Sequence, residues 1–391
     1  MLIDCTDTKH DSRHWFAPIA EHRRRQFLAS KQQGIYITLT GKSLVNFASN
    51  DYLGLRQHPL LKEAAIAAIE QDGIGSGASR LISGNHPQLH QLENEVAAWK
   101  GYESCLIVGS GMLANIGLIQ ALADRHTHIF SDKLNHASLL DGVRLSGAVS
   151  HRFAHCNYNK LDKLLQKETA KKRVIISDGV FSMDGDCADI QKLLQLADTH
   201  KTLLLIDDAH GIGCMGKQQR GLTADFAGHK RLIEVGTFGK AFGAYGAFIL
   251  GTHELIEGLK QRMRTMIYST ALPTFIPAAM LAALPIIQKG DLQKKLQCNL
   301  NLFRKYTCGL NLLPSNTAIQ ALIIGQDSNA LNASKALHDA GFFVPAIRPP
   351  TVQEGTSRLR ITLSAAHTPE QIKALGKALC EAFYQTSESL S

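Results

Sequence analysis

The organisation of this chain is most clearly indicated by the run Thr202-Leu203-Leu204-Leu205-Ile206-Asp207-Asp208-Ala209-His210-Gly211. Its first half is a continuous apolar stretch without polar alternation, which is typical of a strand buried on both faces of a parallel sheet. Ligands of open α/β sheets bind outside the carboxyl ends of the strands. We therefore expect Asp207 and His210 to reach a binding site. Taken alone, an aspartate that caps the next helix and a histidine that packs in the turn would explain the same residues.

Strand and helix patterns alternate along much of the chain. Helical patterns at residues 60–71 and 88–100 are followed by strand patterns at residues 104–108, 128–130 and 173–177. This alternating order predicts an α/β fold, with a large, mainly parallel sheet that carries helices on both faces.

A smaller α+β domain is predicted after residue 285. A helical stretch there is followed by a strand at 318–324, a helix near 332–340 and a strand at 358–362. Short strand patterns also occur near the N-terminus, at 35–37 and 44–46. We therefore predict an N-terminal segment that packs with the small domain, a large domain and the small domain, at residues 1–45, 46–285 and 286–391.

Lys240 closes the run Val235-Gly236-Thr237-Phe238-Gly239-Lys240, about thirty residues after the apolar strand. Burial disfavours the charged form of a lysine and lowers its pKa, and a neutral lysine amine forms Schiff bases. For a lone lysine between glycines, an ammonium that reaches water is the ordinary alternative. Asp207, His210 and Lys240 together fit pyridoxal phosphate, whose pyridinium nitrogen pairs with an acid and whose aldehyde is held by a lysine as an imine.

A candidate phosphate site follows the strand pattern at residues 104–108. Small residues at Gly109-Ser110-Gly111 let backbone N–H groups approach a phosphate, and the start of a helix favours negative charge. A turn without a ligand is the alternative. The run is not G-x-G-x-x-G, so it does not support a dinucleotide site.

The composition is that of an ordinary globular chain. With 391 residues, 45% of them hydrophobic and 19% charged, the chain can bury a large core. The net charge of +8 is spread without a long basic tract or interleaved aromatic residues, which argues against a nucleic-acid partner. We see no apolar run of membrane-spanning length and no signal-peptide core, so we expect no membrane partner and a cytoplasmic location.

The eight cysteines are scattered and include no C-x-x-C pair. This pattern argues against a zinc site or a disulfide framework. We expect no bound metal, and we expect reduced cysteines that are mostly buried.

Six runs of the sequence, taken together, resemble the α-oxoamine synthases, which are fold-type I enzymes that use pyridoxal phosphate. They occur in the family's order, and the similarity extends from about residue 20 to about residue 365. The runs are Ser49-Asn50-Asp51-Tyr52-Leu53-Gly54-Leu55, Gly73-Ile74-Gly75-Ser76-Gly77, Asn135-His136-Ala137-Ser138, Val180-Phe181-Ser182-Met183-Asp184-Gly185-Asp186, Asp207-Asp208-Ala209-His210-Gly211 and Thr237-Phe238-Gly239-Lys240.

A further similarity narrows the comparison within this family. The run Ala346-Ile347-Arg348-Pro349-Pro350-Thr351-Val352, followed by Gly355-Thr356 and Arg358-Leu359-Arg360, is similar to members that join L-alanine to a pimeloyl thioester in biotin biosynthesis. The resemblance leaves open whether acyl carrier protein or coenzyme A carries the pimeloyl group.

The resemblance implies a role for each matching residue. Lys240, His136, Asp207 and His210 would be the catalytic residues, with His136 stacked on the pyridine ring and Asp207 paired with its nitrogen. Ser182 and His210 would bind the phenolic oxygen. Further cofactor contacts would come from Gly111, Met112 and Thr237, and from Thr270 of a second subunit, which implies a homodimer with shared active sites.

The substrate contacts that the resemblance implies are Arg23, Asn50, His136, Thr351 and Arg360. Arg360 would bind the amino-acid carboxylate through two parallel hydrogen bonds, and Arg23 would contact the acyl substrate. The freed amine of Lys240 would remove the α-proton of L-alanine, and the carbanion would attack the thioester before carbon dioxide is lost.

Three alternatives stay open. A sister acyltransferase that condenses glycine with acetyl-CoA or succinyl-CoA would share the cofactor residues, although the run at 347–351 argues against it. A nicotinamide-dependent dehydrogenase is disfavoured by the missing N-terminal G-x-G-x-x-G. A pyridoxal-phosphate-binding regulator without turnover is disfavoured because no DNA-binding module is apparent.

Overall fold

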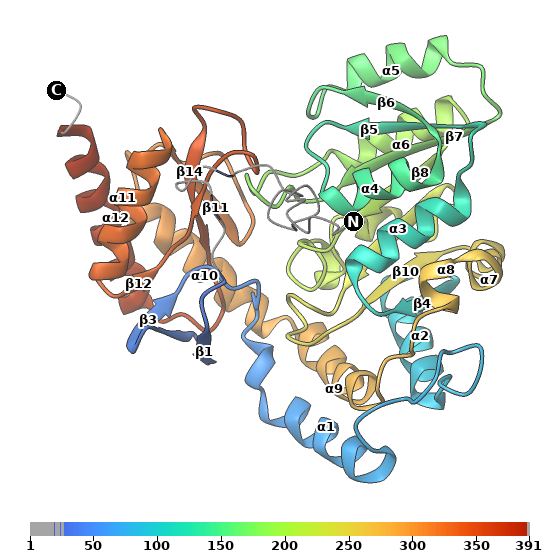
Figure 1. The fold of residues 1–391 in the computed structure, drawn as a ribbon, viewed down its shortest axis with the longest axis horizontal. Helices are drawn as coiled ribbons and strands as arrows, with labels where there is room; N and C mark the ends of the chain where they lie inside the picture. Colours follow the sequence, from blue (N-terminus) through green and yellow to red (C-terminus); the bar gives the residue numbers. More distant parts are fainter. Residues whose placement is uncertain (1–18, 20–23, 25–26, 389–391) are drawn as a thin grey trace, which may run out of the picture.

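The computed structural model describes residue 19, residue 24 and residues 27–388. It forms a larger and a smaller lobe (Figure 1). The chain begins with β1 (Ser30–Gln33), β2 (Tyr36–Leu39) and β3 (Lys42–Asn46). The long central part then contains η4 (Leu55–Gln57), α1 (Pro59–Asp72), α2 (Pro87–Lys100), β4 (Ser104–Val108), α3 (Gly111–Leu122), β5 (Thr127–Asp132), α4 (Ala137–Ser146), β6 (Val149–Phe153), α5 (Tyr158–Lys167), β7 (Lys172–Asp178), α6 (Ile190–Thr199), β8 (Leu203–Asp207), η5 (Lys217–Gln219), η6 (Ala224–Phe226), β9 (Leu232–Thr237), β10 (Ala247–Gly251), α7 (His253–Arg262), α8 (Arg264–Ile267) and α9 (Phe275–Lys289). The last part contains α10 (Asp291–Tyr306), β11 (Ile319–Gly325), α11 (Asp327–Asp339), β12 (Phe342–Phe343), β13 (Ala346–Ile347), β14 (Ser357–Thr362) and α12 (Pro369–Glu388).

The larger lobe is built on a seven-stranded sheet with the order β4-β10-β9-β8-β7-β5-β6. β10 pairs antiparallel with both of its neighbours, and the other neighbouring strands pair in parallel. β10 runs antiparallel to β9 because the connection between them is short, and parallel neighbours need a longer crossover. The predicted mainly parallel sheet is confirmed, and the carboxyl ends of β4, β5, β7, β8 and β9 meet at one edge.

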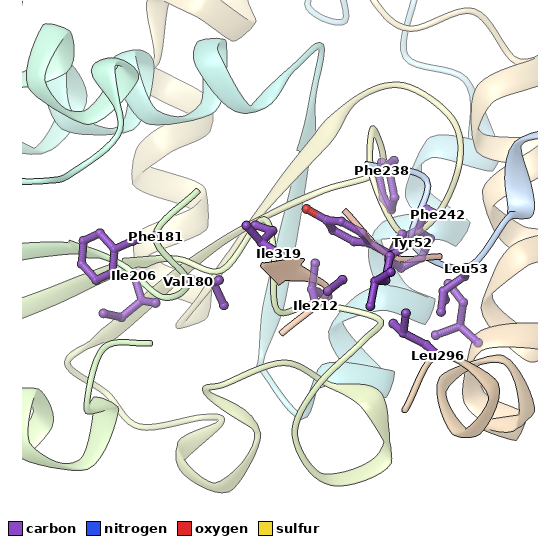
Figure 2. Close-up of a cluster of buried hydrophobic side chains, with 14 of the residues drawn as sticks. Tyr52, Leu53, Val180, Phe181, Ile206, Ile212, Phe238, Phe242, Leu296 and Ile319 are labelled. Carbon is purple, nitrogen blue, oxygen red and sulfur yellow. The ribbon is translucent and has the colours of Figure 1, made fainter. Parts of the chain in front are cut away.

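Helices cover both faces of this sheet, as predicted. Successive strand residues point to opposite faces, so in β4 the side chains of Leu106 and Val108 join one buried cluster and Ile107 joins another. Helices α3, α4 and α7 pack into the first cluster, and α2, α5, α6 and α9 pack into the second. Figure 2 shows part of the second cluster, in which Tyr52 carries a hydroxyl group at the end of a buried ring.

The smaller lobe contains two sheets, with the orders β1-β2-β3-β12 and β11-β14-β13. β3 pairs in parallel with β12, which places Val45 beside Phe342 and joins the N-terminal strands to the C-terminal part of the chain. The predicted domain boundary at residue 285 falls inside α9, which continues through Pro285 to Lys289. The division into domains stays a prediction.

Segment 47–52 is fastened to the end of β14. The Thr362 amide donates to the Phe47 carbonyl (2.7 Å), and the Ala365 amide donates to the Tyr52 carbonyl (2.8 Å). The Ser364 hydroxyl donates to the Asp51 carbonyl (2.8 Å). These bonds fix Tyr52 and its neighbours against the strand that carries Arg360.

The cysteine prediction was partly wrong. The seven cysteines within the described part of the chain are free, but only Cys105 is buried. Cys298 lies on an exposed side of the amphipathic helix α10, and Cys308 is exposed in the turn after it. The scattered spacing of the cysteines carried no information about their burial.

Helix α9 is the most apolar of the longer helices, and it packs its buried side chains against the core. Over the described residues, no single helix is long and apolar enough to cross a membrane. The bent pair α9 and α10, with an angle of 61° between them, reaches that length and composition only when the two are taken together.

Candidate active site

Five segments that contain predicted site residues converge at one edge of the large sheet. They follow β4, β5, β7, β8 and β9, whose carboxyl ends all lie at this edge. In chain order these segments lead to Gly111, His136, Ser182, His210 and Lys240. The parallel strand arrangement therefore gathers residues that are up to about 130 positions apart in the sequence.

Lys240 lies in a tight connection between β9 and β10. The Phe238 amide donates to the Gly246 carbonyl (2.9 Å), and the Gly243 amide donates to the Lys240 carbonyl (2.9 Å). Gly243 has φ of +72°, and a Cβ atom there would lie 2.4 Å from the backbone nitrogen of Arg56. The turn therefore requires glycine at this position and holds Lys240 in place.

Thr237 fixes the start of the same turn. Its hydroxyl donates to the Gly246 carbonyl (2.9 Å) and accepts from the Gly239 amide (3.1 Å). The sequence predicted a cofactor contact for Thr237, whereas the hydrogen bonds of its side chain in this structure support the lysine turn.

The Lys240 amine lies in an environment that favours its neutral form. Burial lowers its pKa from 10.5 to about 8, and Arg360 acts in the same direction. The carboxylates of Asp207 and Asp178 oppose the shift. The direction agrees with the sequence-based expectation of a lysine that can supply a neutral amine.

We predict that covalent capture of pyridoxal phosphate by the apo-protein speeds up about tenfold between pH 7 and pH 9 and then levels off. The neutral fraction of an amine with a pKa of about 8 rises from about one-tenth to about nine-tenths over that range. Borohydride trapping at each pH would measure the rate, with N-acetyl-lysine methyl ester as an unshifted control. A rate that keeps climbing beyond pH 10, in parallel with the control, would contradict the shifted amine.

Asp207 is buried, and both of its carboxylate oxygens are held. One oxygen accepts from the Asn115 side-chain amide (2.6 Å), and the other accepts from the Ala209 backbone amide (3.0 Å). The Asn115 amide also donates to the Ser138 hydroxyl (2.8 Å), which lies 2.7 Å from His136 Nδ1. A continuous hydrogen-bond chain therefore connects Asp207 to His136.

Sequence reasoning missed Asn115 and Ser138. Asn115 follows Gly111 by four positions, so both lie on one side of helix α3. That spacing was the available signal, because a helix that begins at a phosphate can carry a second polar group toward the same ligand.

His136 is positioned by its backbone and its side chain. Its backbone amide donates to Asp178 Oδ2 (3.0 Å), and its Nδ1 atom accepts from the Ser138 amide (3.3 Å) at the start of α4. The residue is nevertheless exposed. An exposed ring that is held at one edge is suited to stacking on a planar ligand.

His210 belongs to a second polar network. Its Nδ1 atom lies 2.5 Å from the Tyr52 hydroxyl, which donates to Asn50 Oδ1 (3.2 Å). Burial, assisted by the charges of Lys240 and Arg360, lowers the His210 pKa well below its usual value. The imidazole is therefore neutral at physiological pH. Tyr52 was part of a quoted run, but sequence reasoning gave it no role.

Arg360 joins this network from β14. Its guanidinium donates to the Asn50 side chain (3.2 Å), the Ser182 carbonyl (2.6 Å) and the Thr362 hydroxyl (3.1 Å). Arg360 is buried, and no carboxylate pairs with it among the residues that the structure describes. Arg358, two residues earlier, forms an ion pair with Asp184. The unpaired guanidinium is therefore available to an acidic ligand.

The structure shows no hydrogen bond between the remaining predicted residues and the Lys240 group within the described range. Gly111 is the first residue of α3, and a Cβ atom there would meet nothing within 4 Å. Met112 is exposed beside it. Thr270 forms a bridge with Ser79 and, like Thr351, is exposed. In this single chain neither has a hydrogen bond to the Lys240 group within the described range, and Arg23 lies outside that range.

These groups fit pyridoxal phosphate. The N-terminus of α3 has open space at Gly111 for an anion. Asp207 offers a buried carboxylate for a pyridinium nitrogen, and Lys240 offers an amine of lowered pKa. The side-chain oxygen of Asn115, buried and without a partner, adds an unused polar atom beside Asp207. The fold and the site define a fold-type I enzyme that depends on pyridoxal phosphate.

Comparisons with known proteins agree with this class. The family model described as aminotransferase class I and II matches residues 42–379. The 8-amino-7-oxononanoate synthase of Saccharophagus degradans is 45% identical over 383 residues, which cover 95% of each chain. The chain belongs to the aminotransferase class I and II family and, within it, to the family of the 8-amino-7-oxononanoate synthases.

Solved structures show the same fold. A high-resolution structure of SPT with its PLP internal aldimine has a TM-score of 0.88 and 26% identity, and the match covers 92% of each chain. The crystal structure of 8-amino-7-oxononanoate synthase from Francisella tularensis has a TM-score of 0.75 and 30% identity, covering 88% of this chain and 98% of that one. The expected fold and cofactor class are confirmed.

Proposed function

We propose that this protein condenses L-alanine with a pimeloyl thioester and releases 8-amino-7-oxononanoate, carbon dioxide and the free thiol carrier, as a step of biotin biosynthesis. The observation that carries the proposal is the buried, carboxylate-free Arg360 in the same site as Lys240 and Asp207. The carbon count of the product agrees. L-alanine without its carboxyl group contributes two carbons, and the pimeloyl group contributes seven, including the new ketone.

Lys240 would both hold the cofactor and move a proton. When bound, pyridoxal phosphate supplies the electron sink that stabilises negative charge at the amino-acid α-carbon. The Lys240 amine, with a pKa of about 8, is matched to removing the α-proton near neutral pH. Asp207 would keep the ring nitrogen protonated, because the Asn115 and Ala209 N–H groups hold its carboxylate in place.

Arg360 would bind the carboxylate of L-alanine. A guanidinium can form two parallel hydrogen bonds to a carboxylate, which fix its direction as well as its charge. The Ser182 carbonyl and the Asn50 side chain orient the Arg360 group. The direction matters because this carboxylate must remain in place during carbon–carbon bond formation and leave only afterwards.

The other predicted residues complete the proposed site. His136 would stack on the cofactor ring, while Ser182 and the neutral His210 would hydrogen-bond its phenolic oxygen. Gly111 and Met112 would bind the phosphate, with Thr237 supporting the Lys240 turn.

We also propose a homodimer with shared active sites, in which Thr270 reaches the phosphate in the partner subunit. The segments around Thr270 expose large apolar side chains that a second copy would cover, among them Ile74, Ile82 and Tyr268. Arg23 and Thr351 are the proposed contacts of the acyl substrate. The net charge of +8 suits an acidic carrier, whether acyl carrier protein or coenzyme A, and such thioesters place the reaction in the cytoplasm.

Substrate discrimination tests this proposal. Thiol release would be measured with pimeloyl-CoA and pimeloyl-acyl carrier protein, each against L-alanine, glycine and L-serine. We expect L-alanine to be preferred over glycine in kcat/KM by about tenfold or more, because a pocket gains that much from one methyl group. Turnover confined to glycine with acetyl-CoA or succinyl-CoA would instead indicate the sister acyltransferase, and a protein that takes up no pyridoxal phosphate would contradict the enzyme class.

A further inference from the structure

A cluster of two histidines and one glutamate lies outside the proposed active site. His128 is on β5, His151 is on the neighbouring strand β6, and Glu168 caps the end of α5. The Nδ1 atom of His128 lies 3.0 Å from His151 Nε2 and 2.9 Å from Glu168 Oε2. The third side of this triangle, from His151 Nε2 to Glu168 Oε2, is 3.6 Å. Three potential ligand atoms therefore converge on one point.

The cluster is separate from the cofactor residues. His128 is the second residue of β5, whereas His136 follows the opposite, carboxyl end of that strand at Asp132. His151 lies on β6, which is the last strand of the sheet. The proposed reaction uses none of these three side chains.

The three side chains are held in this arrangement by other contacts. Glu168 Oε1 accepts from the backbone amides of Thr169 (3.0 Å) and Ala170 (3.3 Å), which leaves Oε2 directed at the histidines. The His151 ring stacks on Phe130, with centroids 4.9 Å apart and planes 14° apart. It also stacks on His128 at 5.1 Å. The convergence is therefore built into the sheet edge and does not depend on one flexible side chain.

Hydrogen bonding alone leaves this triangle poorly satisfied. The Nδ1 atom of His128 carries at most one hydrogen, which cannot point at both His151 and Glu168. The neutral imidazole is the form of histidine that binds metals. A cation at the centre would accept all three lone pairs at once.

The triangle has the size that zinc requires. Tetrahedral zinc with bonds of about 2.0–2.1 Å places its ligand atoms about 3.3–3.4 Å apart. The three observed separations of 2.9, 3.0 and 3.6 Å bracket that value. The side chains are 21%, 25% and 21% exposed for His128, His151 and Glu168, so water can reach the fourth position.

We propose that His128, His151 and Glu168 form a zinc site, with water as the fourth ligand, that ties together β5, β6 and the end of α5. This departs from the sequence-based expectation of no metal, because the three residues are too far apart in sequence to form a ligand motif. Since zinc would bind the folded chain, it would stabilise that chain by an amount that grows with the logarithm of the zinc concentration above the Kd.

A second group of potential ligands, Asp132, His155 and Cys156, has a different character. Both ring nitrogens of His155 face carboxylates, Asp132 at 3.1 Å and Asp186 at 2.7 Å. Despite the opposing effect of burial, these contacts raise the His155 pKa to about 12. The imidazole therefore keeps both protons and has no lone pair for a metal.

Calorimetric titration of the full-length, cofactor-loaded protein with Zn²⁺, after chelator treatment, tests the site. We expect one zinc per chain and a higher unfolding midpoint in its presence. Glu168→Gln and His151→Ala should each weaken zinc affinity about 100-fold or more, since even outer contacts of metal ligands contribute 10- to 100-fold. Glu168→Gln preserves the shape of the side chain, so this variant is expected to keep the native fold even if His151→Ala does not.

Two matched variants complete the test. His126→Ala removes an exposed histidine two residues from the cluster and should bind zinc like the parent protein. Cys156→Ser should also leave binding unchanged. Turnover of the condensation should be equal in all four variants. No zinc binding by the parent protein, unchanged affinity in Glu168→Gln and His151→Ala, or loss of binding in Cys156→Ser would each overturn the proposed site.

Discussion

Replacing Lys240 with alanine should lower kcat by about 10⁴-fold or more. The substitution removes the covalent anchor of the cofactor and the proposed base for the α-proton in one change, and proton transfer alone contributes up to about 10⁴-fold. Steady-state thiol release measures the loss. Borohydride reduction followed by peptide mass analysis should place the phosphopyridoxyl group on Lys240 in the parent protein and on no lysine in the variant.

Lys133→Ala is the matched control for this experiment. Lys133 is exposed and follows β5 at the same edge of the sheet. Its removal should leave both turnover and cofactor attachment intact. If the Lys240→Ala protein kept more than about a tenth of the parent kcat, the double role of Lys240 would be wrong.

Arg360→Ala should raise KM for L-alanine by about 100-fold or more. Truncating one partner of a buried charge pair costs about 2–5 kcal/mol, and Arg360 is the buried cation that no described carboxylate neutralises. Initial rates over a range of L-alanine concentrations give KM and kcat separately. If KM for the thioester rises less than KM for L-alanine, the lost interaction is the one between Arg360 and the amino acid.

Arg358→Ala is the control within the same strand. Arg358 is equally buried but is already paired with Asp184. Its loss should lower the thermal midpoint, because it leaves the Asp184 charge unpaired, while KM for L-alanine changes less than about tenfold. Equal KM effects of the two substitutions would indicate that Arg360 acts through the structure and not through the substrate.

The buried strands were the most predictable part of the fold. The predicted strand at 104–108 coincides with β4, and the apolar half of the run that begins at Thr202 overlaps β8 over Leu203–Ile206. These strands are covered on both faces, so their sequences are continuous apolar runs. β6 was not predicted, because it lies at the sheet edge and its sequence, Val149–Phe153, contains exposed polar side chains. Burial, and not strand geometry, produces the apolar signal.

The site was predictable only as far as local runs extend. Asp207, His210 and Lys240 stand in runs whose chemistry points to the cofactor, and the structure gathers them at one edge of the sheet. Tyr52 acts through His210, which is 158 positions away, so no local pattern indicates its role. Asn115 acts through Asp207, 92 positions away, and only its spacing from Gly111 pointed to it. The pairing of Arg358 with Asp184 is equally long in range. Such contacts depend on how the strands and helices are connected in space, and a single sequence does not show this directly.

The decisive measurement follows the carboxyl carbon of L-alanine in the purified, cofactor-loaded protein. With L-[1-¹³C]alanine and pimeloyl-CoA, we expect labelled carbon dioxide, free thiol and an unlabelled nine-carbon amino ketone in equal amounts. Mass spectrometry of the product and of the evolved gas gives two of these quantities, and a thiol-reactive dye gives the third. A product that retains the label, or thiol release without labelled carbon dioxide, would contradict decarboxylative condensation as the reaction of this protein.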